Sequence, residues 1–176
     1  MSTDLAAQTA ATTATAASET PLTIPVAIVG FGWMGRVHAQ AYARIRHHFP
    51  TLHPVPQLTV IADELADRAG EAARQFGVDA VVTDWRDVVS DNSIAAVSVT
   101  APNFLHREIG VAVASAGKHL WIEKPVGLTA ADARAVADAA AAAGVATAVG
   151  FNYRNVPAVA AAREMICLLY TSPSPR

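Results

Sequence analysis

The chain has 176 residues, a hydrophobic content of 52% and a formal net charge of −2, which together predict one domain with a sizeable core. The mild acidity excludes a strongly basic surface of the kind that binds nucleic acid or an anionic membrane, so we expect neither as a partner. The single cysteine, Cys167, excludes an intramolecular disulfide framework and favours a cytoplasmic location.

Residues 1–23 are mostly alanine and threonine and contain no lysine or arginine. They lack the basic start of a secretory signal and the arginines of a transit peptide, so we expect a disordered tail. No later stretch approaches the roughly 20 uninterrupted apolar residues of a membrane span. We therefore expect residues 24–166 to form a single domain.

The most informative stretch is a G-x-G-x-x-G turn made by Gly30, Gly32 and Gly35. It follows an apolar strand at 26–29 and precedes a helix expected to end near residue 46. Gly30 permits the tight turn, Gly32 leaves room for a diphosphate, and Gly35 lets the helix pack closely on the strand. The helix dipole and its free N–H groups then point at the diphosphate. The alternative is a glycine-rich turn of the kind found in other α/β proteins.

Three prolines interrupt residues 47–57, so we expect a long loop there. The loop contains His47, His48 and His53, which could bind a metal ion. It has no cysteine or carboxylate to complete such a site, so we expect solvated histidines and no metal.

Asp63 stands just after an apolar strand at 58–62, where a dinucleotide-binding fold places an acid on the adenosine ribose. Glu64 follows it, and Arg68 lies one helical turn further on. An extra 2′-phosphate would meet negative charge, so we expect NAD to be preferred over NADP. The alternative role of Asp63 is to cap the N-terminus of a helix at 65–76.

The remaining elements alternate between strand and helix. The expected strands are 80–82, 95–100, 119–122 and 145–149, and the expected helices are 85–89, 104–116 and 130–143. Asp84 and Thr129 are placed to cap two of these helices. The strands are apolar without alternation, which indicates a parallel sheet covered on both faces, a doubly wound α/β Rossmann fold.

Polar side chains follow the last three expected strands. They are Thr100-Ala101-Pro102-Asn103 with His106, then Glu123-Lys124-Pro125, and then Gly150-Phe151-Asn152-Tyr153-Arg154. In an open parallel sheet the ligand binds outside the carboxyl ends of the strands. We therefore expect these clusters to share one functional edge.

As a set, these motifs resemble the cofactor domain of the Gfo/Idh/MocA family, typified by glucose-fructose oxidoreductase and inositol dehydrogenase. The resemblance covers residues 25–166. It rests on the glycine turn with Arg36-Val37-His38, Ala62-Asp63 with Arg68-Ala69, Thr100 to Asn103 with His106, Gly117-Lys118-His119, and Glu123-Lys124-Pro125.

The resemblance implies NAD as the cofactor and a sugar or polyol as the small-molecule substrate. The implied cofactor contacts are Gly30, Gly32, Trp33, Met34 and Gly35 at the diphosphate, Asp63 at the ribose, and Thr100, Pro102, Asn103, His106, Glu123, Lys124, Asn152 and Arg154 toward the nicotinamide. Lys124 is also the implied catalytic residue, hydrogen-bonded to the substrate oxygen. The alternative is a surface lysine paired with Glu123.

Family members continue into a second domain that carries the substrate pocket, a catalytic histidine and the oligomer interface. Here residues 163–166 would begin the connecting helix, and residues 167–176 bring a Ser-Pro repeat that resembles translated adapter sequence. We expect a truncated chain with a foreign tail, the alternative being a genuine disordered end. Such a chain would bind NAD without turnover and would lack the family's oligomer interface.

Two other functions are compatible with parts of this pattern. Methyltransferases that bind S-adenosylmethionine also use a glycine-rich loop and an acid after the second strand, but they do not require Glu123-Lys124-Pro125. A regulatory module that binds NAD only as a ligand would show binding and no sugar oxidation.

Overall fold

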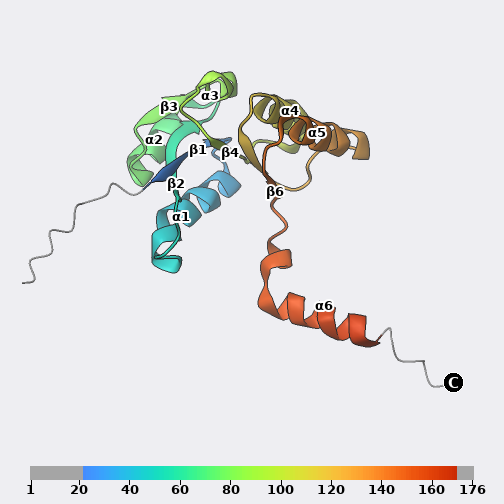
Figure 1. Ribbon diagram of the computed structural model, residues 1–176. Coiled ribbons are helices and arrows are strands. Elements are labelled where there is room, and N and C mark those ends of the chain that lie inside the picture. Colours follow the sequence, from blue (N-terminus) through green and yellow to red (C-terminus); the bar gives the residue numbers. More distant parts are fainter. Residues whose placement is uncertain (1–21, 170–176) are drawn as a thin grey trace, which may run out of the picture.

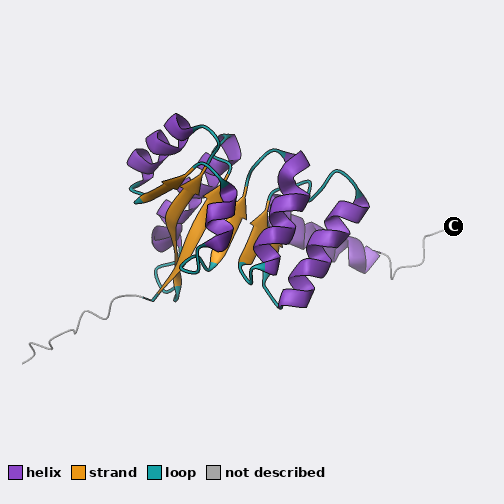
Figure 2. Cartoon of the chain, turned by 90° about the horizontal axis from the view of Figure 1, so that it is seen from above, coloured by secondary structure: helices purple, strands orange, loops and turns teal. Residues whose placement is uncertain are grey.

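The computed structural model describes residues 22–169, which form a parallel sheet with helices on both of its faces (Figures 1 and 2). The strands are β1 (Thr23–Val29), β2 (Val55–Ala62), β3 (Ala80–Val82), β4 (Ala96–Val99), β5 (His119–Ile122) and β6 (Thr147–Val149). The helices are α1 (Trp33–His48), α2 (Ala66–Phe76), α3 (Trp85–Ser90), α4 (His106–Ser115), α5 (Ala130–Ala143) and α6 (Pro157–Leu169), with 3-10 turns η1 (Asn103–Leu105) and η2 (Asn152–Asn155).

The six strands lie in the order β3-β2-β1-β4-β5-β6, and every neighbouring pair is parallel. This is the doubly wound order, so the predicted fold class is confirmed. The order reverses between β1 and β4. A ligand of such a sheet binds at this reversal, outside the carboxyl ends of the strands.

The sheet buries apolar side chains on both of its faces. Ile28 and Ile61 pack with Ala69 under α1 and α2, while Val99 packs with Ile109 under α3, α4 and α5. Each of these isoleucine and valine side chains contributes roughly 1.5–3 kcal/mol when fully buried. This burial on two sides is why the strands are apolar at consecutive positions.

Several element boundaries differ from those expected from the sequence. β2 begins at Val55, and its first residues pair only with β1. Pro56 has no N–H to donate, but β3 does not extend this far, so no hydrogen bond to a strand on that side is lost. The expected helix 104–116 divides into η1 and α4. Within residues 22–169, no helix is both long enough and apolar enough to cross a membrane.

Both ends of the chain were expected to be tails. Thr23 already belongs to β1, and the expectation for the preceding residues falls almost entirely outside the described part of the chain. α6 begins at Pro157, earlier than expected, and continues to Leu169. The rest of the expected foreign tail, residues 170–176, also lies outside the described part.

The N-terminus of α5 has a reciprocal cap. The Thr129 hydroxyl accepts a hydrogen bond from the Asp132 N–H at 3.1 Å, and the Asp132 carboxylate accepts one from the Thr129 N–H at 3.0 Å. We expect Thr129→Ala to lower the free energy of unfolding by about 1 kcal/mol, and Thr129→Ser, which keeps the hydroxyl, to retain most of it. Urea denaturation measures both variants. An equal loss in the two would show that the hydroxyl is not what stabilises this helix end.

Candidate functional site

The three glycines of the first turn have different surroundings. Gly30 has a φ of 87°, and a Cβ added to it would lie 2.5 Å from the Cα of Ala101. A Cβ on Gly35 would lie 2.5 Å from the Gly30 carbonyl oxygen. By contrast, a Cβ on Gly32 would meet nothing within 4 Å in the described part of the chain beyond the residues next to it in sequence. Packing therefore requires the first and last glycine, whereas the open space at Gly32 is available to a ligand.

The N-terminus of α1 lies at the same turn. Gly32 caps this helix without a side-chain hydrogen bond, and the first turn of the helix contains no acidic residue. Its N–H groups and the positive end of its dipole are thus not satisfied by a side chain of this turn. Such a helix end is suited to an anion, and a diphosphate is one.

Asp63 is fixed firmly at the end of β2. Its side chain is buried, with Oδ2 accepting the Phe31 N–H at 2.6 Å and Oδ1 accepting the Leu65 N–H at 3.0 Å. The Arg68 Nε lies 3.4 Å from the same Oδ1. The N-cap residue of α2 is Leu65, so the interpretation of Asp63 as that cap is wrong. Asp63 instead ties the glycine turn to the β2–α2 loop and holds its carboxylate at the sheet edge.

A cavity of about 670 Å³ lies at the carboxyl ends of β1, β2 and β4. Half of the residues expected at the cofactor line it: Gly30, Gly32, Trp33, Met34, Asp63, Thr100 and Pro102. Gly35 sits directly behind the turn, where its lack of a side chain lets α1 approach. The glycine turn, the helix end and the Asp63 carboxylate therefore meet around one space large enough for part of a dinucleotide.

One part of the cavity lining was not anticipated. It is formed by Thr83 and Asp84, between β3 and α3, and by Trp85 and Arg86 at the start of α3. Asp84 caps α3 as expected, accepting the Arg86 N–H at 2.9 Å, and the Arg86 guanidinium lies 4.4 Å from the centre of the Trp85 ring. Their position directly after β3 could have indicated from the sequence that they line the cavity, because the parallel strands of one sheet end at the same edge.

The charge of the cavity is more balanced than Asp63 and Glu64 alone indicate. Arg68 and Arg86 also line it. Both guanidinium groups are engaged, since Arg68 contacts Asp63 and Arg86 lies 2.9 Å from Glu108 and 3.3 Å from Asp84. The expected repulsion of a 2′-phosphate is therefore only partly offset.

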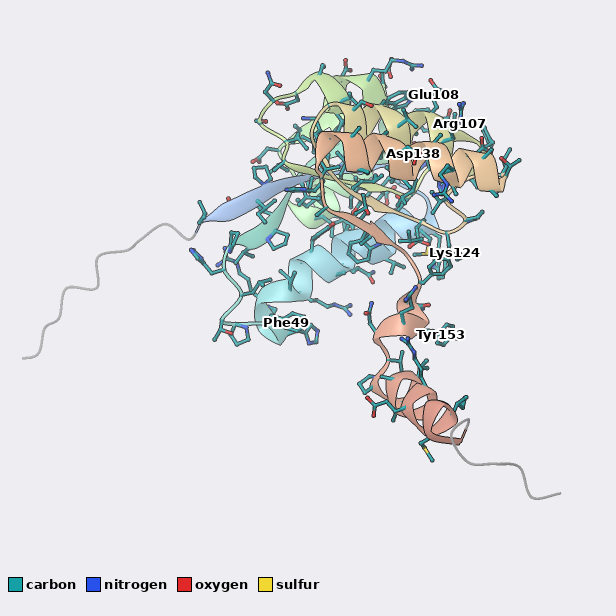
Figure 3. All side chains as sticks on the ribbon, turned by 45° about the vertical axis from the view of Figure 1, so that its right-hand side comes forward. Phe49, Arg107, Glu108, Lys124, Asp138 and Tyr153 are labelled. Atoms are coloured by element: carbon teal, nitrogen blue, oxygen red, sulfur yellow. The ribbon has the colours of Figure 1, made fainter. Side chains whose placement is uncertain are left out.

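The polar cluster after β5 lies further along the edge and outside this cavity. Glu123 is buried, and its Oε1 lies 3.1 Å from the Nε2 of His38. Lys124 is exposed, and Figure 3 shows its side chain at the surface. Among the ion pairs of the described residues, none joins Lys124 to Glu123, so the alternative of a paired surface lysine is not what the structure shows. The Lys124-Pro125 peptide bond is cis.

His106, expected beside the nicotinamide ribose, is buried under the sheet edge. Its Nδ1 lies 2.7 Å from the Pro125 carbonyl oxygen and its Nε2 lies 2.8 Å from the Ala101 carbonyl oxygen. The ring thereby joins the turn after β4 to the turn after β5. Asn103 is exposed at the start of η1 and does not line the cavity described above.

Asn152 and Arg154 were expected in the same cleft. Both are exposed in η2, from which the chain continues into α6, away from the sheet (Figures 1 and 3). The structure does not bring them to the cavity. The physical reason is that, as far as the side chains of η2 and α6 are described, none of them joins either buried cluster of the sheet.

Asp63 and Lys124 lie on the same edge of the sheet, because β2 and β5 run parallel in one sheet. β1 and β4 separate them, so they are three inter-strand steps of about 4.8 Å apart. A single extended ligand along this edge can therefore approach both.

Within residues 22–169, no group of three or more His, Cys, Asp or Glu side chains is arranged to hold a metal ion.

The pKa of His38 is lowered from 6.5, mainly by burial, with the hydrogen bond and the charge of Glu123 opposing the shift. The neutral ring therefore contributes stability that is fully present above pH 6.5 and is lost as the pH falls toward the lowered pKa, because only the unfolded chain takes up the proton. We expect thermal stability to decrease on acidification through this window, and His38→Gln to flatten that part of the profile. Melting temperatures at a series of pH values test this, and an unchanged slope in the variant would contradict it.

The sequence profile of the Gfo/Idh/MocA oxidoreductase family, described as having an NAD-binding Rossmann fold, matches residues 24–151. The chain belongs to this family. Among curated Gfo/Idh/MocA relatives, it is 40% identical over 141 residues to levoglucosan dehydrogenase of Pseudarthrobacter phenanthrenivorans, covering 80% of this chain and 36% of that protein. It is 31% identical over 140 residues to the NAD+-dependent scyllo-inositol 2-dehydrogenase of Bacillus subtilis, covering 80% and 39%.

Solved structures of Gfo/Idh/MocA proteins share the fold. The complex of levoglucosan dehydrogenase with NADH superposes with a TM-score of 0.78 at 40% identity, over 82% of this chain and 39% of that one. Scyllo-inositol dehydrogenase from Lactobacillus casei, with bound NAD(H) and scyllo-inositol, gives a TM-score of 0.72 at 26% identity, over 83% and 41%. The chain thus spans well under half the length of the relatives it matches.

Proposed function

We propose that these 176 residues bind NAD, and that a polypeptide of the relatives' length containing them oxidises or reduces a sugar or polyol. Three features that meet around one cavity support this proposal. They are the open space at Gly32, the N-terminus of α1, which no side chain caps, and the buried Asp63 carboxylate. The levoglucosan and inositol dehydrogenases among the relatives support the substrate class.

The residues present fit a dinucleotide. The diphosphate would lie against the backbone of Gly32, Trp33 and Met34, where no side chain intervenes. One ribose would hydrogen-bond Asp63, whose carboxylate oxygens still have acceptor capacity beside the two N–H groups they hold. When bound, NAD supplies the group that accepts or donates a hydride.

At the other end of the edge, we assign to Lys124 a hydrogen bond to the substrate oxygen. Its exposed ammonium, free of an ion pair with Glu123, is available for this contact.

Calorimetric titration of the purified chain with NADH and with NADPH tests the cofactor assignment. We expect NADH to bind more tightly, because Asp63 accepts from a free ribose and repels a 2′-phosphate. Binding of neither nucleotide would contradict the proposal, and tighter binding of NADPH would contradict the preference.

A second assay separates the proposed enzyme from an NAD-binding module without turnover. The chain is incubated with NAD and a panel of sugars and polyols, including levoglucosan and inositol, while NADH absorbance is followed. We expect binding without oxidation from these residues, because they span less than two fifths of the length of either curated dehydrogenase. NADH formation would show that this segment contains a complete reaction site.

A further inference from the structure

Two buried histidines hold the turn that carries Lys124, and they approach it from opposite faces of the sheet. His38 comes from α1, on the face that α1 and α2 cover, and contacts the Glu123 carboxylate. His106 comes from α4, on the face covered by α4 and α5, and contacts the Pro125 carbonyl. Of the three residues in the turn, Glu123 is buried while Lys124 and Pro125 are exposed. The turn is thus anchored on both sides of the residue that faces solvent.

The His38 contact reaches Lys124 through a single side chain. The Nε2 of His38 lies 3.1 Å from the Glu123 Oε1, and the other carboxylate oxygen, Oε2, accepts the backbone N–H of Lys124 at 3.3 Å. The His38 ring also lies against Trp121, with 4.8 Å between the ring centres. Its remaining nitrogen, Nδ1, is buried and has no hydrogen-bond partner in the described part of the chain. The Nε2 nitrogen is therefore the one that bonds, and it bonds to Glu123.

Gly150, just after β6, closes the third side of this arrangement. A Cβ added at Gly150 would collide with the Glu123 carboxylate. The carboxylate thus occupies the space that a side chain would fill at that position. His38 and the Lys124 N–H thus contact the two oxygens of the Glu123 carboxylate, and the missing side chain at Gly150 leaves room for it.

Burying an imidazole and a carboxylate is costly, and apolar side chains of similar volume stabilise a sheet edge at least as well. What apolar side chains cannot do is fix the backbone N–H of the next residue. We propose that His38 is a positioning residue: its N–H fixes the Glu123 carboxylate, which fixes the backbone of Lys124 and directs its ammonium along the ligand edge. This inference rests on the proposed function only for what Lys124 then contacts.

The chain offers a selective probe of Lys124, because Lys118 and Lys124 are its only lysines. Lys118 is buried, and its Nζ donates to the carbonyls of Asp91 and Ile94 at 2.6 and 3.0 Å. Reductive methylation with carbon-13 formaldehyde therefore labels Lys124 and the N-terminal amine. NMR of the labelled chain reports the mobility of the Lys124 methyl groups, and nitrogen-15 relaxation reports the order of its amide.

Three variants separate hydrogen bonding from packing. His38→Phe keeps a ring against Trp121 and donates nothing, His38→Gln keeps an N–H donor near Glu123, and Gly150→Ala displaces the carboxylate without changing His38. Without cofactor, we expect the order of the Lys124 amide to be lost in His38→Phe and Gly150→Ala and retained in His38→Gln. Equal order in all of them, or equal loss in His38→Gln and His38→Phe, would overturn the proposal.

The wild-type chain provides a measurement that does not depend on a variant folding. Long-range proton–nitrogen spectra of His38 should show a neutral ring with its proton on Nε2, and the Lys124 amide should be as ordered as those of β5. A proton on Nδ1, or a mobile Lys124 amide, would overturn the proposal.

Addition of NADH then tests the proposed function separately. We expect the Lys124 methyl signal to shift in the wild type and in His38→Gln and this shift to be lost in His38→Phe. The affinity should change by less than about threefold, because His38 shares no hydrogen-bond partner with Asp63 and does not line the cavity beside Gly32. No NADH binding by the wild type would refute the proposed function and leave the result without cofactor to decide the role of His38.

Discussion

Gly32→Ala should weaken NAD binding by at least about tenfold, or roughly 1.4 kcal/mol, while it leaves the fold intact. The added Cβ would enter the space proposed for the diphosphate, and within residues 22–169 nothing but its own neighbours in the chain comes within 4 Å of it. The residue has a φ of −75°, which alanine adopts without strain. We expect the free energy of unfolding to change by less than about 1 kcal/mol, the range for exchanging glycine and alanine at an N-cap.

Calorimetric titration with NADH measures the affinity, and urea denaturation of the same preparation measures the free energy of unfolding. Gly77→Ala is a control for the affinity alone, because Gly77 faces open space away from the cavity, while its φ of 66° costs an alanine stability. Unchanged NADH affinity in Gly32→Ala would show that the diphosphate does not lie on this turn.

Gly30→Ala should instead strongly lower the free energy of unfolding. Gly30 has a φ of 87°, and the added Cβ would lie 2.5 to 2.9 Å from backbone atoms of Thr100 and Ala101. Those atoms belong to the turn that directly follows β4, where the Thr100 N–H bonds the Val29 carbonyl of β1, so they cannot move aside without disturbing the sheet. We expect a loss of about 3 kcal/mol or more, a large share of the roughly 5–15 kcal/mol that stabilises a typical domain.

Gly144→Ala separates the clash from the backbone conformation. Gly144 has a φ of 65° at the end of α5, and a Cβ there would have no neighbour within 4 Å. It should therefore lose only the cost of a left-handed alanine, roughly 1–2 kcal/mol. If thermal denaturation showed Gly30→Ala to be no less stable than Gly144→Ala, the close contact of the glycine turn with β4 would be refuted.

The sheet could be predicted from the sequence because its signals are local. Each strand is an apolar run that stops at a glycine, a proline or a polar residue, and the glycines at 30, 32 and 35 mark the first strand-to-helix turn. The start of β2 could not be predicted, because Pro56 is tolerated only where β3 does not reach, and that depends on strand lengths that no local pattern states.

The site could be predicted where function follows from position along the sheet edge. Asp63 lies at the cavity because β2 ends there. The roles of His38 and His106 could not be predicted, because His38 meets a residue 85 positions away and His106 meets the carbonyl of one 19 positions away. Whether a histidine faces a ligand or a neighbouring carbonyl is decided by such long-range packing, which spacing in the sequence does not contain.

We expect one dinucleotide to lie along the sheet edge, from Asp63 past Gly32 to Lys124. A titration of the nitrogen-15-labelled chain with NADH can follow the amides of these three residues together. We predict that all three signals shift and that the shifts fit a single dissociation constant. A Lys124 signal that stays unchanged while those of Gly32 and Asp63 shift to saturation would contradict the claim.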